Sequence, residues 1–159
     1  MMSDLQGGAL VVVPCSGAKL WHAAPAGELY TGTFHKLARQ AAAALVEQHG
    51  GQVVILSALH GLLRLDQVVE PYDLSIGQVG SVSVSTVALQ LLQLLRGHDD
   101  VANVVALLPR AYRTVLAAAV EQLPADVRPR LFEPMRGATG VGYQRQRLAQ
   151  LRDGTLSLA

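Results

Sequence analysis

The sequence is poor in cysteine and has no long apolar run. Its single cysteine, Cys15, excludes an intramolecular disulfide and a cysteine-based zinc cluster. The positive mean hydropathy comes from alanine, valine and leucine spread through periodic segments, and none of these segments reaches the roughly 18 apolar residues of a membrane span. The N-terminus carries no basic leader before its first apolar run. We therefore expect a cytoplasmic protein without a membrane partner.

Several motifs of well-known sites are also absent. The sequence contains neither the GxxxxGK[ST] loop of ATP-binding proteins nor the GxGxxG turn of dinucleotide-binding domains. It has no HExxH pair, and its five histidines are scattered. A hydrolase triad from Ser16 or Ser57 with His60 and Asp73 is disfavoured because the GxSxG elbow is missing. We predict no cofactor and no metal.

The apolar pattern that is present predicts an α/β fold. Short runs without alternation indicate strands covered on both faces, as in a parallel sheet. Segments with helical spacing lie between them and end at glycine or proline. The predicted strands are 11–13, 53–56, 104–108 and 130–132, and the predicted helices are 34–45, 87–95, 112–123 and 141–151. We expect a single three-layer domain over residues 1–159, with a mostly parallel sheet of about four strands, flanking helices, and disorder in residues 1–8.

Two stretches, residues 14–33 and 61–83, do not fit this alternation. Both follow predicted parallel strands, and ligands of such sheets bind beyond the carboxyl ends of the strands. Long loops in compact domains are usually functional. These two stretches are therefore expected to form the site.

The first stretch offers a turn of small residues that can hold an anion. Ser16 and Lys19 are its candidate ligand-binding residues, since backbone amides, a hydroxyl and a cation converge there. Tyr30 offers a ring for a base to stack on. His35 falls in the first turn of a helix, which favours a neutral imidazole. An alternative role for this stretch is redox chemistry at the Cys15 thiol.

The second stretch concentrates groups for acid-base chemistry. A hydroxyl, an imidazole, carboxylates and a phenol follow one buried strand within 17 residues. Pro71 restricts the residues around it and fixes how Tyr72 is presented. The candidate catalytic residues are His60, Glu70 and Asp73, and the candidate ligand-binding residues are Ser57 and Tyr72.

Arginine dominates the basic residues and gathers near the C-terminus. Eleven of the thirteen basic residues are arginine, and six of them lie within residues 128–152. Arg110 follows the third strand, where it can bind a phosphate or carboxylate. Residues 135–144 combine glycines with arginine before a helix, which indicates either an anion-binding nest or a flexible turn. The C-terminal arginines as a group favour a solvated helix face over a phosphate-binding patch, which stays the alternative.

Three separated motifs, SGAKL at residues 16–20, LYTG at 29–32 and LSALHGLL at 56–63, together resemble the peroxide-stress YaaA family. SGAKL at residues 16–20 is similar to the SPAKTL start of that family, and LYTG at 29–32 is similar to its VYxGL segment. LSALHGLL at 56–63, running on to Glu70, Pro71 and Tyr72, resembles its LSGLYGxLRPLDxxxPYRLEMG core. A shorter uncharacterised bacterial family with CSxxK and SAxxGL...PYD motifs resembles the sequence more closely still.

The resemblance implies a nucleic acid or nucleotide as ligand. YaaA-type proteins are associated with DNA binding and with limiting oxidative damage, and similar domains accompany enzymes of deazaguanine base modification. The present sequence departs from that pattern at His60, which replaces a tyrosine, and at Asp73, which replaces an arginine. Both changes favour acid-base chemistry over phosphate binding.

Two functions from different classes remain open. The first is an enzyme acting at the N-glycosidic bond of a base or modified base, with Glu70 or Asp73 facing the sugar and His60 assisting the departing base. The second is a noncatalytic DNA-, RNA- or nucleotide-binding stress-response module that uses the same pocket together with the arginines.

Overall fold

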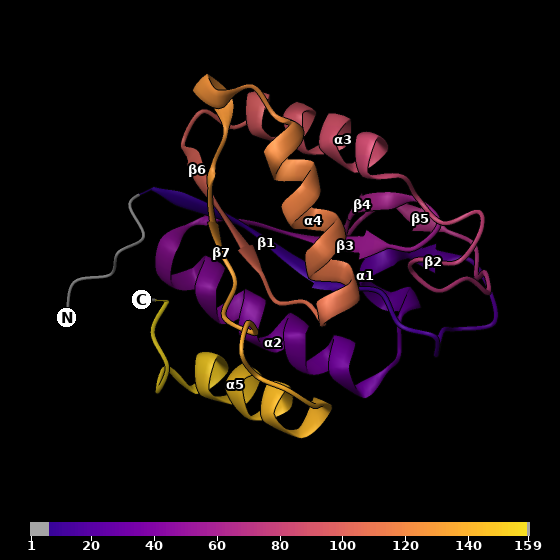
Figure 1. Cartoon of the computed structure of the whole chain (residues 1–159). Coiled ribbons are helices and arrows are strands. Elements are labelled where there is room, and N and C mark those ends of the chain that lie inside the picture. Colours follow the sequence, from indigo (N-terminus) through magenta and orange to yellow (C-terminus); the bar gives the residue numbers. More distant parts are fainter. Residues whose placement is uncertain (1–6, 159) are drawn as a thin grey trace.

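The computed structural model describes residues 7–158, which form a mixed α/β fold around a five-stranded sheet (Figure 1). The strand order is β4-β3-β1-β6-β7, and every neighbouring pair is parallel except the antiparallel pair of β3 and β4. The strands are β1 (Gly8–Pro14), β3 (Gly51–Ser57), β4 (Gly61–Arg64), β6 (Val101–Ala106) and β7 (Arg130–Phe132).

Helices cover both faces of this sheet (Figure 1). Residues of α2 and α5 pack in one hydrophobic cluster, and residues of α3 and α4 pack in the other. The helices are α2 (Thr33–His49), α3 (Val84–Arg96), α4 (Arg110–Gln122) and α5 (Val141–Asp153). Each apolar stripe faces the sheet, so burial of these stripes holds the layers together.

The central strand β1 contributes side chains to both hydrophobic clusters. All seven of its residues are buried. Val11 and Val13 pack in the cluster with α2, whereas Leu10 and Val12 pack in the cluster with α3 and α4. Successive side chains of a strand point to opposite faces, so a strand covered on both faces needs apolar residues without alternation.

The predicted strands and helices are all present, but the stretches expected to be loops contain more structure. β4 adds an antiparallel edge strand, so the sheet has five strands rather than about four. A second, two-stranded sheet pairs β2 (Ala24–Pro25) with β5 (Val68–Val69), and α1 (Ala26–Leu29) follows β2. Elements this short leave no periodic signal in a sequence. A 3₁₀ turn, η1 (Ala125–Val127), precedes β7.

The segment expected to be disordered lies mostly outside the described residues. Residues 1–6 are not described, but β1 already begins at Gly8. Gly8 joins the sheet because its amide donates to the carbonyl of Asp100 at 3.0 Å.

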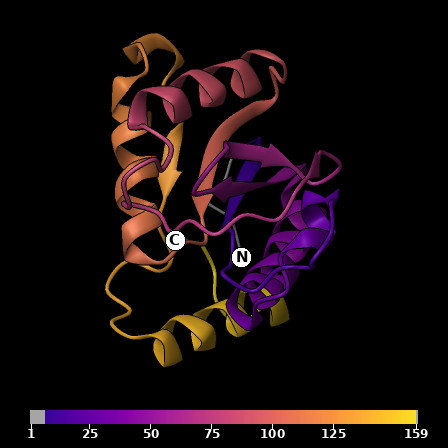
Figure 2. The same cartoon turned by 90° about the vertical axis from the view of Figure 1, so that its right-hand side faces the viewer.

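The sheet topology creates a natural binding edge. The chain passes from β1 to β3 on one side and later returns to β6 on the other side of β1. The connections that leave the carboxyl ends of β1 and β6 therefore run in opposite directions. Open α/β sheets bind ligands in the crevice outside the carboxyl ends of two such strands. Figure 2 turns the molecule so that the ribbon of β2 and β5 and its surrounding loops face the viewer.

Candidate functional site

Three hydroxyl groups form a hydrogen-bonded chain beyond the carboxyl end of β3. Ser57 Oγ lies 2.6 Å from Tyr72 Oη, and Tyr72 Oη lies 2.7 Å from Tyr30 Oη. Ser57 ends β3 and is completely buried, while Tyr30 is 2% exposed. Tyr72 is only partly buried, so it is the member of this chain that reaches the surface.

Ser57 is positioned by the tight turn between β3 and β4. Its Oγ accepts hydrogen bonds from the amides of Leu59, at 3.2 Å, and His60, at 3.0 Å. Gln90 of α3 anchors the far side of the turn, donating to the carbonyl of His60 and accepting from the amide of Leu62. Gly61 has a φ of 75°, a left-handed conformation that glycine adopts without strain.

The tyrosines of the site are held in the protonated form. Burial raises the pKa of Tyr30 and of Tyr72 above the ordinary value of 10.0, and for Tyr72 the neighbouring Cys15 adds to the effect. Burial likewise raises the pKa of Tyr112, again with a contribution from Cys15. These phenols therefore act as neutral hydrogen-bonding groups and not as phenolate bases.

Lys19 and His60 both lie against the ring of Tyr72. The ammonium of Lys19 lies 4.3 Å from the ring centroid, in cation–π geometry. The imidazole of His60 stands perpendicular to the ring, with 5.6 Å between centroids. We call these five residues, Tyr30, Ser57, Tyr72, Lys19 and His60, the Tyr72 cluster.

Ser16 fastens the loop that carries Lys19. Its hydroxyl donates to the carbonyl of Ala18 at 2.6 Å and accepts from the amide of Gly32 at 3.2 Å. Lys19 also forms an isolated antiparallel bridge with Tyr30. The predicted ligand residue Ser16 thus shapes the turn, and both of its hydrogen-bonding roles are occupied within the protein.

Cys15 and His35 lie beneath the cluster. Cys15 is buried, and its Sγ lies 3.1 Å from the hydroxyl of Tyr112. His35 is 2% exposed, and its Nδ1 lies 2.6 Å from the carbonyl oxygen of Pro14. A carbonyl only accepts, so Nδ1 carries the proton. Burial lowers the pKa of His35, in agreement with the neutral imidazole expected from its place in α2.

The predicted carboxylates do not enter the hydrogen-bonded chain. Glu70 and Asp73 flank Tyr72 in sequence, and both side chains are exposed. Within residues 7–158 neither carboxylate takes part in a hydrogen bond or ion pair. They lie outside the buried network but remain free to meet a ligand.

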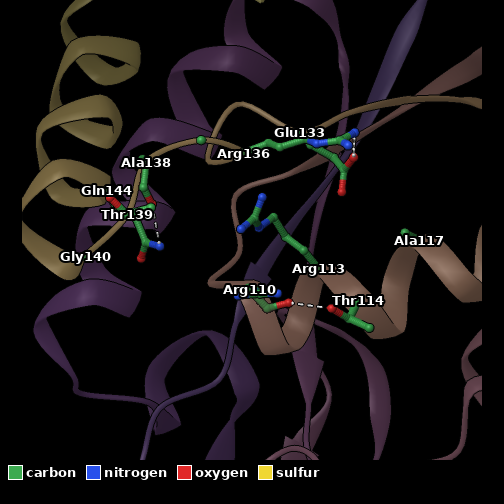
Figure 3. Close-up of a pocket in the computed structure, with 11 residues that line it drawn as sticks. Arg110, Arg113, Thr114, Ala117, Glu133, Arg136, Ala138, Thr139, Gly140 and Gln144 are labelled. Atoms are coloured by element: carbon green, nitrogen blue, oxygen red, sulfur yellow. Dashed lines mark hydrogen bonds and ion pairs between the residues drawn. The ribbon is translucent and has the colours of Figure 1, made fainter.

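Arg110 belongs to a different part of the same sheet edge. It begins α4 and lines a pocket of about 660 Å³ together with Arg113, Arg136 and Gln144 (Figure 3). Sequence reasoning missed Arg113, although its spacing of three from Arg110 places both on one helix face. It also missed Trp21, two residues after Lys19, whose side chain is 88% exposed.

Two classes of feature are absent from the part of the chain that the structure describes. No group of three or more histidine, cysteine, aspartate or glutamate side chains in residues 7–158 could hold a metal ion. Nor does any helix there combine the length and apolar character that crossing a membrane requires.

Comparison with known proteins identifies a family. No curated protein matches the sequence. Residues 10–150 match DUF6884, described as a family of unknown function. This match runs from β1 into α5 and so includes the whole Tyr72 cluster and the pocket around Arg110. The chain therefore belongs to the DUF6884 family.

Proposed function

We propose that the Tyr72 cluster binds the base of a nucleotide or nucleic acid. The observation that carries this proposal is the placement of Lys19 and His60 on the ring of Tyr72, the phenol of the chain that reaches the surface. The ammonium of Lys19 donates and the imidazole of His60 can donate or accept, as the polar edge of a base requires, and both lie on the ring of Tyr72. Protonated phenols also add no negative charge that would repel phosphate.

Three further features support a base as the ligand. The cluster lies beyond the carboxyl end of β3, at the sheet edge where open α/β folds bind ligands. The motifs that build it are those that resemble the YaaA family. Trp21, on the loop of Lys19, presents an exposed indole, and aromatic faces stack on bases of any sequence.

Lys19 provides the sharpest test because the chain contains only one other lysine, Lys36. Trp21 is the single tryptophan, so its fluorescence can report binding of nucleosides, nucleoside monophosphates, and short single-stranded DNA and RNA. Lys19→Gln should weaken binding at least about tenfold, since the ammonium held over the ring of Tyr72 can no longer make a charge-assisted hydrogen bond to the ligand. Lys36→Gln removes the same charge from an exposed position in α2 and should change affinity less than about twofold. Absence of binding across the panel, or equal losses in both variants, would reject the proposal.

A catalytic form of the proposal is hydrolysis of the N-glycosidic bond. It is favoured by Glu70 and Asp73, two exposed carboxylates within two positions of Tyr72 in the sequence that have no partner within residues 7–158. In this reaction the bond between C1′ and the base nitrogen breaks, the base leaves with a proton that His60 can supply, and water adds its hydroxyl to C1′ while its other proton returns to His60. A carboxylate near the sugar stabilises the positive charge that develops there.

Release of free base, followed by mass spectrometry, separates the enzyme from the binding module. For an enzyme, Glu70→Gln or Asp73→Asn should lower the release rate at least about 100-fold. Glu47→Gln, an exposed carboxylate of α2, is the matched control and should leave the rate unchanged. If the wild type binds but releases no base from nucleotides or from modified DNA and RNA, the noncatalytic stress-response module is the better account.

A further inference from the structure

The start of α4 and the loop before α5 enclose a second site, which we call the arginine pocket. Three arginines, Arg110, Arg113 and Arg136, line its volume of about 660 Å³. Figure 3 shows Arg113 extending from α4 toward the loop that carries Glu133 and Arg136. The pocket lies beyond the carboxyl ends of β6 and β7, on the same sheet edge as the Tyr72 cluster.

The charge in this pocket is poorly compensated. Glu133 is the one acidic side chain among its lining residues, and within residues 7–158 its one ion pair is with the largely exposed Arg136, at 3.7 Å. The guanidinium groups of Arg110 and Arg113 have no partner in residues 7–158, and Nε of Arg113 is buried without a hydrogen bond. An anion in the pocket would pair with both guanidinium groups and would give the buried Nε–H of Arg113 an acceptor. Both effects stabilise the bound state.

The backbone on the opposite wall is also suited to an anion. Gly140 precedes α5, and no side chain caps the amides of the first turn of this helix. Gly137 and Gly140 have φ values of 84° and 94°, so glycine is needed to hold the loop in this conformation. Gln144 fixes the loop, since its Nε2 donates to the carbonyl of Ala138 at 3.2 Å.

We infer that the arginine pocket binds a phosphate group of the ligand. The planar fork of arginine matches phosphate oxygens in pairs, and amides at a helix start favour the same charge. Tyr112 lies between Arg110 and Arg113 in α4, and its hydroxyl contacts Cys15 at the end of β1. The first turn of α4 thus joins the arginine pocket to the region of the Tyr72 cluster. The identity of the ligand as a nucleotide or nucleic acid rests on the proposed function, but phosphate binding itself does not.

Calorimetric titration with inorganic pyrophosphate tests the pocket alone. Arg110→Gln and Arg113→Gln should each weaken binding at least about tenfold. Arg96→Gln, an exposed arginine in the last turn of α3, changes the net charge equally and should alter affinity less than about twofold. Arg110 is exposed, so its variant tests the inference even if Arg113→Gln fails to fold. No binding by the wild type, or an equal loss in Arg96→Gln, would overturn the inference.

Titrations with two further ligands identify the source of the phosphate and distinguish failure of this inference from failure of the proposed function. A nucleoside diphosphate supplies terminal phosphates, and a single-stranded oligonucleotide without terminal phosphates supplies only backbone phosphates. Dependence of either ligand on Arg110 and Arg113 supports the inference and names its source. If pyrophosphate binding depends on the arginines while Lys19→Gln leaves nucleotide binding unchanged, the inference stands and the function proposed for the Tyr72 cluster fails. If nucleotide binding depends on Lys19 but on neither Arg110 nor Arg113, the function proposed for the Tyr72 cluster stands and the inference about the arginine pocket fails.

Discussion

The hydroxyl of Ser57 donates its proton to the phenol oxygen of Tyr72 across 2.6 Å. This direction follows because the two acceptor positions of Ser57 Oγ are taken by the amides of Leu59 and His60. Tyr72 in turn shares a hydrogen bond with Tyr30 at 2.7 Å. The turn after β3, the segment after β5 and the end of α1 are thereby held together by three side-chain oxygens.

Removing the central hydroxyl should destabilise the fold. Tyr72→Phe leaves the buried hydroxyls of Ser57 and Tyr30 without their shared partner, so the free energy of unfolding should fall by about 1–3 kcal/mol. Denaturant unfolding measures the difference. Tyr143→Phe is the control, since Tyr143 is 66% exposed, and its effect should stay within about 0.5 kcal/mol. Equal effects of the two substitutions would contradict the assigned network.

Stability should also fall in alkali. Burial raises the pKa of Tyr30, Tyr72 and Tyr112 above the value of 10.0 that applies when they are solvated. Above pH 10 the unfolded chain therefore loses phenolic protons that the folded chain retains, and the equilibrium shifts toward unfolding as pH rises. The slope can reach about 1.4 kcal/mol per pH unit for each tyrosine.

Unfolding free energies between about pH 9 and pH 11 check this slope. The double variant Tyr30→Phe and Tyr72→Phe lacks two of the titrating groups, so its stability should depend less steeply on pH. An identical alkaline slope in wild type and double variant would show that these phenols are not responsible.

His35 should have the opposite pH dependence. Burial lowers its pKa below 6.5, so below that pH the unfolded chain takes up a proton that the folded chain resists. Stability is therefore lost as pH falls, by up to about 1.4 kcal/mol per pH unit from this group. His35→Asn can keep the donor to Pro14 but cannot titrate, so its stability should decline less steeply in acid. Parallel acid profiles of variant and wild type would exclude His35 as the cause.

A side chain at position 32 should destabilise the protein because it would collide with the side chain of Ser16. A Cβ at Gly32 would lie 2.7 Å from Cβ of Ser16, although the φ of −65° is one that any residue adopts. Gly32→Ala should therefore displace Ser16 and lower the free energy of unfolding by about 1–3 kcal/mol. At Gly17, in the same loop as Ser16, an added Cβ meets no atom within 4 Å, so Gly17→Ala should be nearly neutral in thermal unfolding. A neutral Gly32→Ala would show that the loop can rearrange.

The sequence predicted the sheet core and the helices because their signals are local and periodic. Short apolar runs such as residues 11–13 are typical of strands covered on both faces, and the stripe of α2 repeats at helical spacing. The edge strand β4 was not predicted because it has only four residues and follows a three-residue turn. A segment this short shows no apolar periodicity. The pairing of β2 with β5 depends on residues more than 40 positions apart.

The site was predicted in part for the same reason. Residues that follow strand ends could be placed at one sheet edge, which is how Ser57, Lys19 and Tyr72 were selected. Their mutual contacts depend on how two long stretches fold over each other, and no spacing encodes that. The exposure of Glu70 and Asp73 and the burial of Tyr30 follow from these same tertiary contacts.

A crystal structure of the protein with a bound nucleoside monophosphate tests the central claim most directly. We predict a base within contact distance, about 4 Å, of Tyr72, Lys19 or His60. A nucleotide bound with its base on another face of the molecule, with the Tyr72 cluster left in contact with solvent alone, would contradict the account.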